Sequence, residues 1–145
     1  MIITDKDIIL PENLKLFQEL QEDELLKNFF LVGGTALALQ LGHRLSIDLD
    51  FFCGEDFETE AIQNHLSKNY GFYADFITKN TLKGFIRDVK VDLITHAYPL
   101  IHPLLKHENL RLASLEDIAA MKLNAILTAV ITKKTFMTSI SFWSI

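Results

Sequence analysis

Hydrophobic and polar residues between positions 29 and 53 change their spacing along the chain, and each spacing predicts a different element. Residues 29–32 are consecutive apolar side chains, which is typical of a short strand buried on both faces. Residues 36–41 are almost entirely apolar and predict a short buried helix, for which Gly42 is the expected end. From residue 47 onward the period becomes two, as in a strand with one buried face. The stretch therefore predicts a strand, a turn, a helix and a second strand.

Two glycines occupy the predicted turn between the first strand and the helix. Gly33 and Gly34 remove side chains where the chain must turn, which lets the backbone approach a ligand closely. Thr35 is expected to cap the helix that follows. Free backbone N–H groups and the positive end of a helix dipole both favour an anion, so this turn is a candidate phosphate-binding site.

Asp48 and Asp50 alternate with large apolar residues and therefore share one face of the second predicted strand. Aspartate is disfavoured in strands, and two neighbouring carboxylates repel each other and resist losing water. Such a pair tends to be protonated, solvated or neutralised by a cation. The expected cation is Mg²⁺, or Mn²⁺ in its place, because Mg²⁺ takes hard oxygen ligands and retains water and phosphate ligands. A phosphate-binding turn beside a pair of carboxylates indicates chemistry on a nucleoside triphosphate.

Weaker patterns predict further helices and strands around this motif. A helix is expected to begin at Pro11, whose fixed backbone angle suits the first helical position. A polar surface helix is expected at residues 57–70, with His65 in a solvated position.

Three strands are expected after this helix, at residues 72–78, 82–87 and 90–95. Turns are expected between them at Lys79-Asn80 and Arg87-Asp88, and an irregular segment is expected at residues 96–105. Ser114 is expected to cap a last helix at residues 114–130.

Two further charged residues lie within otherwise apolar patterns. Asp92 alternates with apolar neighbours on the last predicted strand, where it is either a half-exposed strand residue or a third carboxylate beside Asp48 and Asp50. Lys122 lies in the middle of the apolar arc of the last predicted helix. A lysine there either extends past its neighbours to water or contacts an anion in a cleft.

Composition excludes several classes of protein. The 145 residues suit a single domain with its own core, and 49% hydrophobic residues exclude a disordered chain. No apolar run approaches the roughly 18 residues that a membrane span requires. The N-terminus lacks a secretory signal pattern, and the single cysteine excludes a disulfide framework, so a cytoplasmic location is expected. The formal net charge of -5 argues against a broad nucleic-acid-binding surface.

The central motif and two later segments resemble a known family. The matching segments are residues 33–37, 42–44, 46–52, 90–93 and 114–122. Together they resemble nucleotidyltransferase-fold proteins of the AbiEii/AbiGii abortive-infection toxin type. The resemblance covers roughly residues 29–127, and the diglycine and Asp-x-Asp elements are specific only in combination.

The resemblance implies an α+β fold of the nucleotidyltransferase type, in which helices flank a mixed β-sheet. It implies a single domain at residues 1–145 with a core at 29–112. Its implied catalytic and metal-binding residues are Asp48, Asp50 and Asp92, and its implied nucleotide-binding residues are Gly33, Gly34, Thr35 and Lys122. Arg44 and Ser46 lie between the two halves of the motif, where they either orient phosphate or hold the second strand.

The resemblance also implies a reaction and partners. Members of this type transfer a nucleoside monophosphate from a nucleoside triphosphate to an acceptor, and they often act as the toxin of a toxin–antitoxin pair. The implied partners are a tRNA or protein acceptor and a cognate antitoxin, with no membrane.

The family pattern is not continued over residues 132–142, where further acidic positions and helices are expected. A single lost base in the gene would explain this departure, and the chain would then be C-terminally truncated. Two alternatives to the transferase therefore stay open. One is an impaired remnant that binds nucleotide or antitoxin without turnover, and the other is a metal-dependent phosphohydrolase that uses the same carboxylates.

Overall fold

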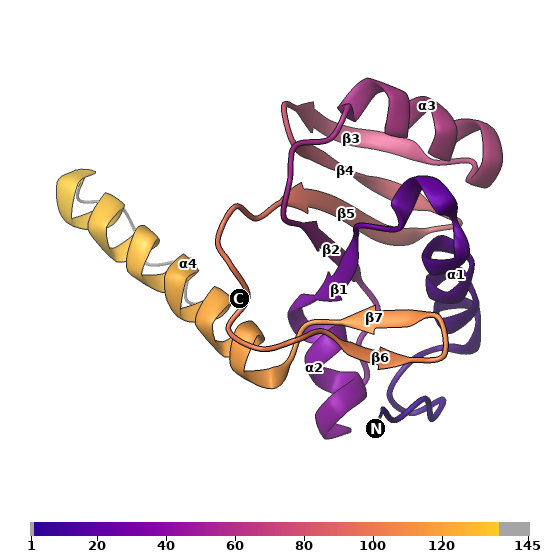
Figure 1. Cartoon of the computed structure of the whole chain (residues 1–145), viewed down its shortest axis with the longest axis horizontal. Helices are drawn as coiled ribbons and strands as arrows, with labels where there is room; N and C mark the ends of the chain where they lie inside the picture. The colour runs from indigo at the N-terminus through magenta and orange to yellow at the C-terminus, as the bar shows by residue number, and fades with distance from the viewer. Residues whose placement is uncertain (1, 137–145) are drawn as a thin grey trace.

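A mixed seven-stranded β-sheet forms the centre of the protein in a computed structural model that describes residues 2–136 (Figure 1). The strands are β1 (Phe30–Val32), β2 (Leu49–Cys53), β3 (Tyr73–Thr78), β4 (Thr81–Ile86), β5 (Val89–Thr95), β6 (Leu105–His107) and β7 (Leu110–Leu112). They lie in the order β3-β4-β5-β2-β1-β7-β6. At the centre, β2 is parallel to β5 and antiparallel to β1, so the sheet brings together strands that are far apart in the sequence.

Helices cover both faces of the sheet. They are α1 (Pro11–Glu22), α2 (Gly33–Leu41), α3 (Thr59–Tyr70) and α4 (Leu115–Phe136), with a 3₁₀ turn at Glu24–Leu26. The helices α1 and α3 pack on one face, whereas α2 and the first half of α4 lie on the other. From its start beside α2, α4 extends away from the sheet (Figure 1).

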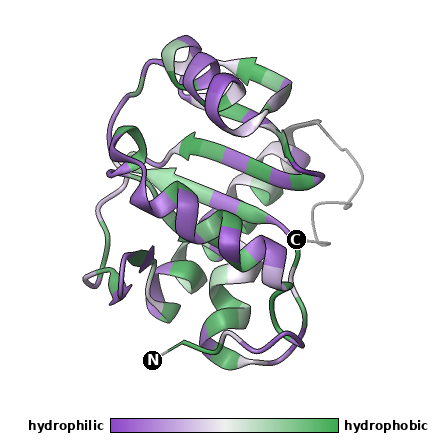
Figure 2. Ribbon diagram, turned by 90° about the vertical axis from the view of Figure 1, so that its right-hand side faces the viewer, coloured by the Kyte–Doolittle hydropathy of each residue, from purple (hydrophilic) through white to green (hydrophobic). Residues whose placement is uncertain are grey.

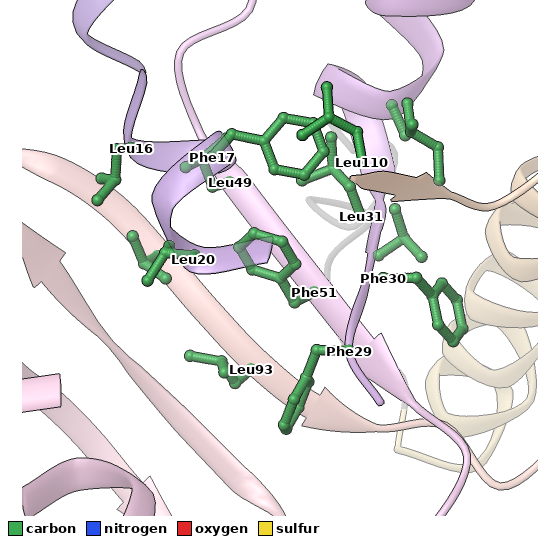
Figure 3. Packing of buried hydrophobic residues seen from close by; sticks show 14 of the residues in the cluster. Leu16, Phe17, Leu20, Phe29, Phe30, Leu31, Leu49, Phe51, Leu93 and Leu110 are labelled. Atoms are coloured by element: carbon green, nitrogen blue, oxygen red, sulfur yellow. The ribbon is translucent and has the colours of Figure 1, made fainter. Parts of the chain in front are cut away.

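The main core lies between the sheet and the pair α1 and α3. Leu20 of α1 and Leu66 of α3 meet Phe51 and Leu93 on the central strands, and Phe17 approaches Phe51 with ring centroids 5.9 Å apart (Figure 3). All five side chains are at most 2% exposed. Burial of a large apolar side chain contributes about 1.5–3 kcal/mol, so this cluster holds the central strands in place.

The opposite face of the central strands is more polar. Along β2, Leu49, Phe51 and Cys53 are buried in the core, while Asp50 and Phe52 are half-buried on the side of α2 and α4. Figure 2 shows hydrophilic residues between hydrophobic ones on strands of the sheet. On β2, burial alternates from one residue to the next. This alternation is the period of two that the sequence predicts.

Most of the predicted elements are confirmed. Gly42 ends α2 in the left-handed conformation, with φ 61°. The turns between the later strands fall where predicted, with positive φ at Asn80, Arg87 and Asp88. Pro11 is the first residue of α1. The mixed sheet with flanking helices is the predicted fold class.

Several expectations about the elements differ from the structure. Residues 105–112 contain the hairpin of β6 and β7, which the sequence pattern does not predict. The last helix continues to Phe136 rather than ending at residue 130. Ile47 is 56% exposed and does not share the buried face of β2. The segment that departs from the family pattern is helical up to Phe136, and its remainder lies outside the described residues.

His65 is not in the solvated position that its polar helix predicts. Its Nε2 lies 2.6 Å from Oδ2 of Asp23, and the hydroxyl of Tyr70 donates a hydrogen bond to the same oxygen. Because Asp23 also accepts a hydrogen bond from the backbone N–H of Leu25, this cluster ties α3 to the 3₁₀ turn. His65 therefore has a structural role.

A substitution at Gly84 tests the packing of β4. A Cβ atom at Gly84 would clash with the carbonyl oxygen of Tyr73 and lie 2.6 Å from the ring of Phe72. We expect Gly84→Ala to lower the free energy of unfolding by about 1–3 kcal/mol, as overpacking does. Urea denaturation measures this change. Gly54→Ala is the control, because no atom lies within 4 Å of its added Cβ. Equal stability of the two variants would contradict the close packing of Tyr73 and Phe72 against Gly84.

Candidate functional site

The parallel pairing of β2 and β5 brings two predicted carboxylates together. Asp50 and Asp92 are direct partners in this register, so both side chains point to the same face of the sheet. Asp48 precedes β2 by one residue and lies two positions before Asp50. Asp92 is 8% exposed, and it lies in the face that α2 and α4 cover. Two carboxylates on paired strands and a third just before β2 therefore line one site.

The three negative charges are only partly neutralised. Burial, followed by the negative charges of Asp92 and Asp48, raises the pKa of Asp50 to about 6. The ammonium group of Lys90 donates hydrogen bonds to both carboxylate oxygens of Asp92, at 3.2 and 3.1 Å. Burial opposes the charge on Lys90, but the hydrogen bond and charge of Asp92 outweigh it and raise the pKa of Lys90. Lys90 is thus a counter-ion for Asp92, a role that the sequence pattern does not predict.

The predicted diglycine turn between β1 and α2 is the first turn of α2 itself, and it lies directly against these carboxylates. Gly33 has a positive φ of 70°, and a Cβ atom on it would lie 2.8 Å from Oδ2 of Asp50. A Cβ atom on Gly34 would lie 2.6 Å from Nη2 of Arg44. Glycine is therefore required at position 33 by both the backbone conformation and the close approach of Asp50.

The prediction that Thr35 caps α2 is wrong. The helix begins at Gly33 with Val32 as its N-cap, and no side chain hydrogen-bonds to this end of the helix. The hydroxyl of Thr35 donates to the backbone carbonyl of Asp48 and lies 2.6 Å from the hydroxyl of Ser46. Both hydroxyl groups are buried. Thr35 and Ser46 therefore fix the segment that leads to Asp48.

Arg44 and Lys122 complete the predicted set. Nη1 of Arg44 donates to the carbonyl oxygen of Leu45 at 3.1 Å, which holds the guanidinium group beside Gly34. Lys122 of α4 is exposed, and it lines the same cleft together with Ile118 and Met121.

All of the predicted site residues line a single cleft of about 670 Å³. These residues are Gly33, Gly34, Thr35, Arg44, Ser46, Asp48, Asp50, Asp92 and Lys122. A cleft of this volume is in the range that accommodates a small-molecule ligand.

Apolar side chains that the sequence pattern does not single out form the rest of the wall. They include Phe52 of β2, Ile94 of β5, and Ile118, Met121 and Ala125 of α4. The alternation that places Asp48 and Asp50 on one face extends to Phe52, so this residue could have been found from its position. Ile118 and Ala125 share the apolar arc of Lys122, but which surface this arc lines depends on where the helix packs.

The donor chemistry of the site fits Mg²⁺. Carboxylate oxygens are the ligands that Mg²⁺ prefers. The pKa of Asp50 is raised first by burial and then by the negative charges of Asp92 and Asp48, which a cation would neutralise. Within residues 2–136, however, no group of three acidic, histidine or cysteine side chains is placed so that it could hold a metal ion as it stands. Binding through all three carboxylates would require side-chain movement, and Asp92 would have to leave Lys90.

Solved structures share this arrangement of strands and helices. A candidate nucleotidyltransferase from Thermotoga maritima superposes with a TM-score of 0.56 at 17% identity, covering 90% of this chain and 96% of that chain. JHP933 from Helicobacter pylori superposes with a TM-score of 0.53 at 22% identity, covering 79% and 56%. A tRNA-processing enzyme superposes with a TM-score of 0.52 at 16% identity, covering 80% and 36%. The protein therefore has the nucleotidyltransferase fold, as predicted.

The family follows from the sequence match. Residues 15–136 match the model of the family described as nucleotidyl transferase AbiEii toxin, type IV toxin–antitoxin system, and the chain belongs to this family. An uncharacterised protein of Aquifex aeolicus is 34% identical over 103 residues, which are 68% of this chain and 50% of that protein. The chain thus spans about half the length of this relative. Among the described residues, no helix is long and apolar enough to cross a membrane.

The raised pKa of Asp50 predicts how stability depends on pH. In the unfolded chain Asp50 has an ordinary pKa near 3.8, so the folded state alone holds its proton between about pH 4 and 6. Stability conferred by this group therefore falls as the pH rises through that window.

We expect Asp50→Asn, which removes the charge, to gain stability over the unsubstituted protein by about 2–3 kcal/mol between pH 4 and pH 7. Urea denaturation across this range, with a chelator present, measures the difference. A difference that does not change with pH would contradict the environment described for Asp50.

Proposed function

We propose that this protein transfers a nucleoside monophosphate from a nucleoside triphosphate to an RNA or protein acceptor, with Mg²⁺ or Mn²⁺ as cofactor. The observation that carries the proposal is the convergence of Asp48, Asp50 and Asp92 on the cleft that the diglycine turn borders. Membership of the AbiEii family agrees with this reaction.

The residues of the cleft suit separate parts of the substrate. Asp48 and Asp50 would hold the metal ion, with Asp92 as a third ligand, and the ion would neutralise charge on the phosphates. The uncapped start of α2 at Gly33 and Gly34 would bind phosphate oxygens through backbone N–H groups. Lys122, on the facing helix, would pair with the pyrophosphate that leaves.

The transfer step needs a base and a leaving group. The acceptor hydroxyl would attack the α-phosphorus, the bond to pyrophosphate would break, and the acceptor's proton would pass to Asp92. Thr35 and Ser46 would act indirectly, by holding the backbone of Asp48. Arg44, beside Gly34, would contact phosphate. Phosphoryl transfer of this kind depends mainly on positioning and electrostatic stabilisation.

The same proposal includes partners and a location. The family description names a type IV toxin–antitoxin system, which supports a toxin role, with a tRNA or protein as acceptor and a cognate antitoxin as partner. A cytoplasmic location agrees with a single, buried cysteine in its thiol form.

Transfer assays test the reaction. We expect the chain to move labelled nucleoside monophosphate from at least one triphosphate to RNA or protein, releasing pyrophosphate. Asp48→Asn should reduce the rate about 100-fold or more, because it removes a charge at the proposed metal site while keeping the shape. Asp75→Asn, on the exposed strand β3, is the matched control and should leave the rate unchanged.

The products separate the alternatives. Release of inorganic phosphate without transfer would identify a phosphohydrolase. Nucleotide or antitoxin binding without any turnover would identify a binding protein. Either result would overturn the transferase proposal.

Metal binding is tested without turnover. We expect Mg²⁺ or Mn²⁺ to bind the chain in isothermal titration calorimetry, and Asp48→Asn to weaken that binding at least about tenfold, since one of the proposed ligands loses its charge. A chelator should abolish transfer. Metal affinity that is the same in the Asp48→Asn and Asp75→Asn variants would place the ion elsewhere.

A further inference from the structure

Part of the cleft wall beside the carboxylates is apolar. Phe52 of β2 is paired with Ile94 of β5. This pair lies on the same face of the sheet as Asp50 and Asp92, two residues further along each strand. Met121 of α4 lines the cleft with them. The charged and hydroxyl side chains of the lining belong to the segments around the diglycine turn and the carboxylates, apart from Lys122. The cleft therefore combines a charged part with an apolar part.

The ring of Phe52 is held in a stack. The imidazole of His96 lies against it with centroids 5.0 Å apart and an interplanar angle of 14°. Tyr98 packs in turn against His96, with centroids 5.2 Å apart. Burial lowers the pKa of His96, so its imidazole is neutral near pH 7 and stacks as an uncharged ring. Phe52 is thus supported through His96 while it still lines the cleft.

The spacing of the two parts fits a nucleotide. Residues two apart on a strand are about 7 Å apart, which is comparable with the ribose that separates a base from its α-phosphate. With the α-phosphate at Asp50 and Asp92, the base would therefore reach the level of Phe52 and Ile94. Aromatic side chains bind bases by stacking, and stacking tolerates all four bases because each has a π-face.

We propose that Phe52, supported by His96 and flanked by Ile94 and Met121, is the nucleobase subsite of the cleft. This inference rests on the proposed function, because it assumes that the carboxylate end of the cleft holds the triphosphate. The apolar side chains offer no hydrogen bonds that would select a base. The subsite therefore accepts all four nucleoside triphosphates, and it favours purines because their larger rings stack over a larger area.

A comparison of the affinities for inorganic tripolyphosphate and for the four nucleoside triphosphates distinguishes binding at the charged part of the cleft from binding at its apolar part. Isothermal titration calorimetry with the full chain in Mg²⁺ measures each affinity. We expect each triphosphate nucleotide to bind about tenfold more tightly than tripolyphosphate. The four nucleotides should differ from one another only a few-fold, with ATP and GTP ahead of CTP and UTP.

Variants at Phe52 test whether the difference in affinity between the nucleotides and tripolyphosphate comes from stacking on the Phe52 ring. Phe52→Leu keeps an apolar side chain and removes the ring, so nucleotide affinity should fall about tenfold while tripolyphosphate affinity stays the same. Phe52→Tyr keeps the ring and should retain nucleotide affinity. Phe76→Leu, at an exposed aromatic residue on β3, is the control and should change neither.

The outcomes distinguish this inference from the function on which it rests. If tripolyphosphate binds as tightly as the nucleotides, or if Phe52→Leu weakens both ligands equally, the base subsite is wrong while the phosphate site stands. If one nucleoside triphosphate binds more than about 100-fold more tightly than the others, the proposal that the base is bound by stacking alone is wrong. If neither tripolyphosphate nor any nucleotide binds, the proposed function fails together with the inference. The comparison of ligands on the unsubstituted chain remains valid even if Phe52→Leu does not fold.

Discussion

The parallel register of β2 and β5 is the constraint on which the rest of the site depends. It sets Asp50 directly beside Asp92 and turns both carboxylates toward α2 and α4. A shift of one residue would point Asp50 into the core and bring Phe51 out of it. The register is held because Leu49, Phe51 and Leu93 are almost completely buried on the opposite face. Hydrophobic packing on one face of the sheet therefore keeps Asp50 and Asp92 side by side on the other face, where their carboxylates repel each other.

That repulsion is typical of a functional site. An aspartate whose pKa is raised by burial and by two neighbouring carboxylates lowers the stability of the fold at neutral pH. The structure offsets part of the charge with Lys90, which bonds both oxygens of Asp92. The glycine at position 33 lets the start of α2 approach Asp50 without a clash. The cleft thus presents backbone N–H groups and carboxylates side by side, a combination suited to a metal ion and a phosphate group.

Local sequence patterns predict most of the residues of this site. The position of Asp92 beside Asp50 depends instead on the pairing of β2 with β5. The period of two predicts that Asp48 and Asp50 share a face, and the helical spacing places Lys122 in the apolar arc of its helix, either in water or in contact with an anion in a cleft. Nothing local places Asp92 beside Asp50, because the two strands are separated by α3, β3 and β4. The family resemblance, rather than the spacing, supplied that residue.

The errors have equally specific causes. Thr35 follows a glycine pair and has the chemistry of a cap, but its hydroxyl bonds to the carbonyl of Asp48 once β2 folds back on α2. His65 lies in a polar helix, and its partner Asp23 is 42 positions away. Both bonds depend on contacts between elements.

The central claim is that one metal ion and one triphosphate bind between the start of α2 and the carboxylates of β2 and β5. A crystal structure with Mn²⁺ and a non-hydrolysable nucleoside triphosphate tests this directly, since Mn²⁺ is located by its anomalous scattering. We expect the anomalous peak within coordination distance of Asp48 and Asp50, Asp92 turned from Lys90 toward it, and the phosphates against Gly33 and Gly34. A triphosphate bound elsewhere, or a peak away from all three carboxylates, would contradict the account.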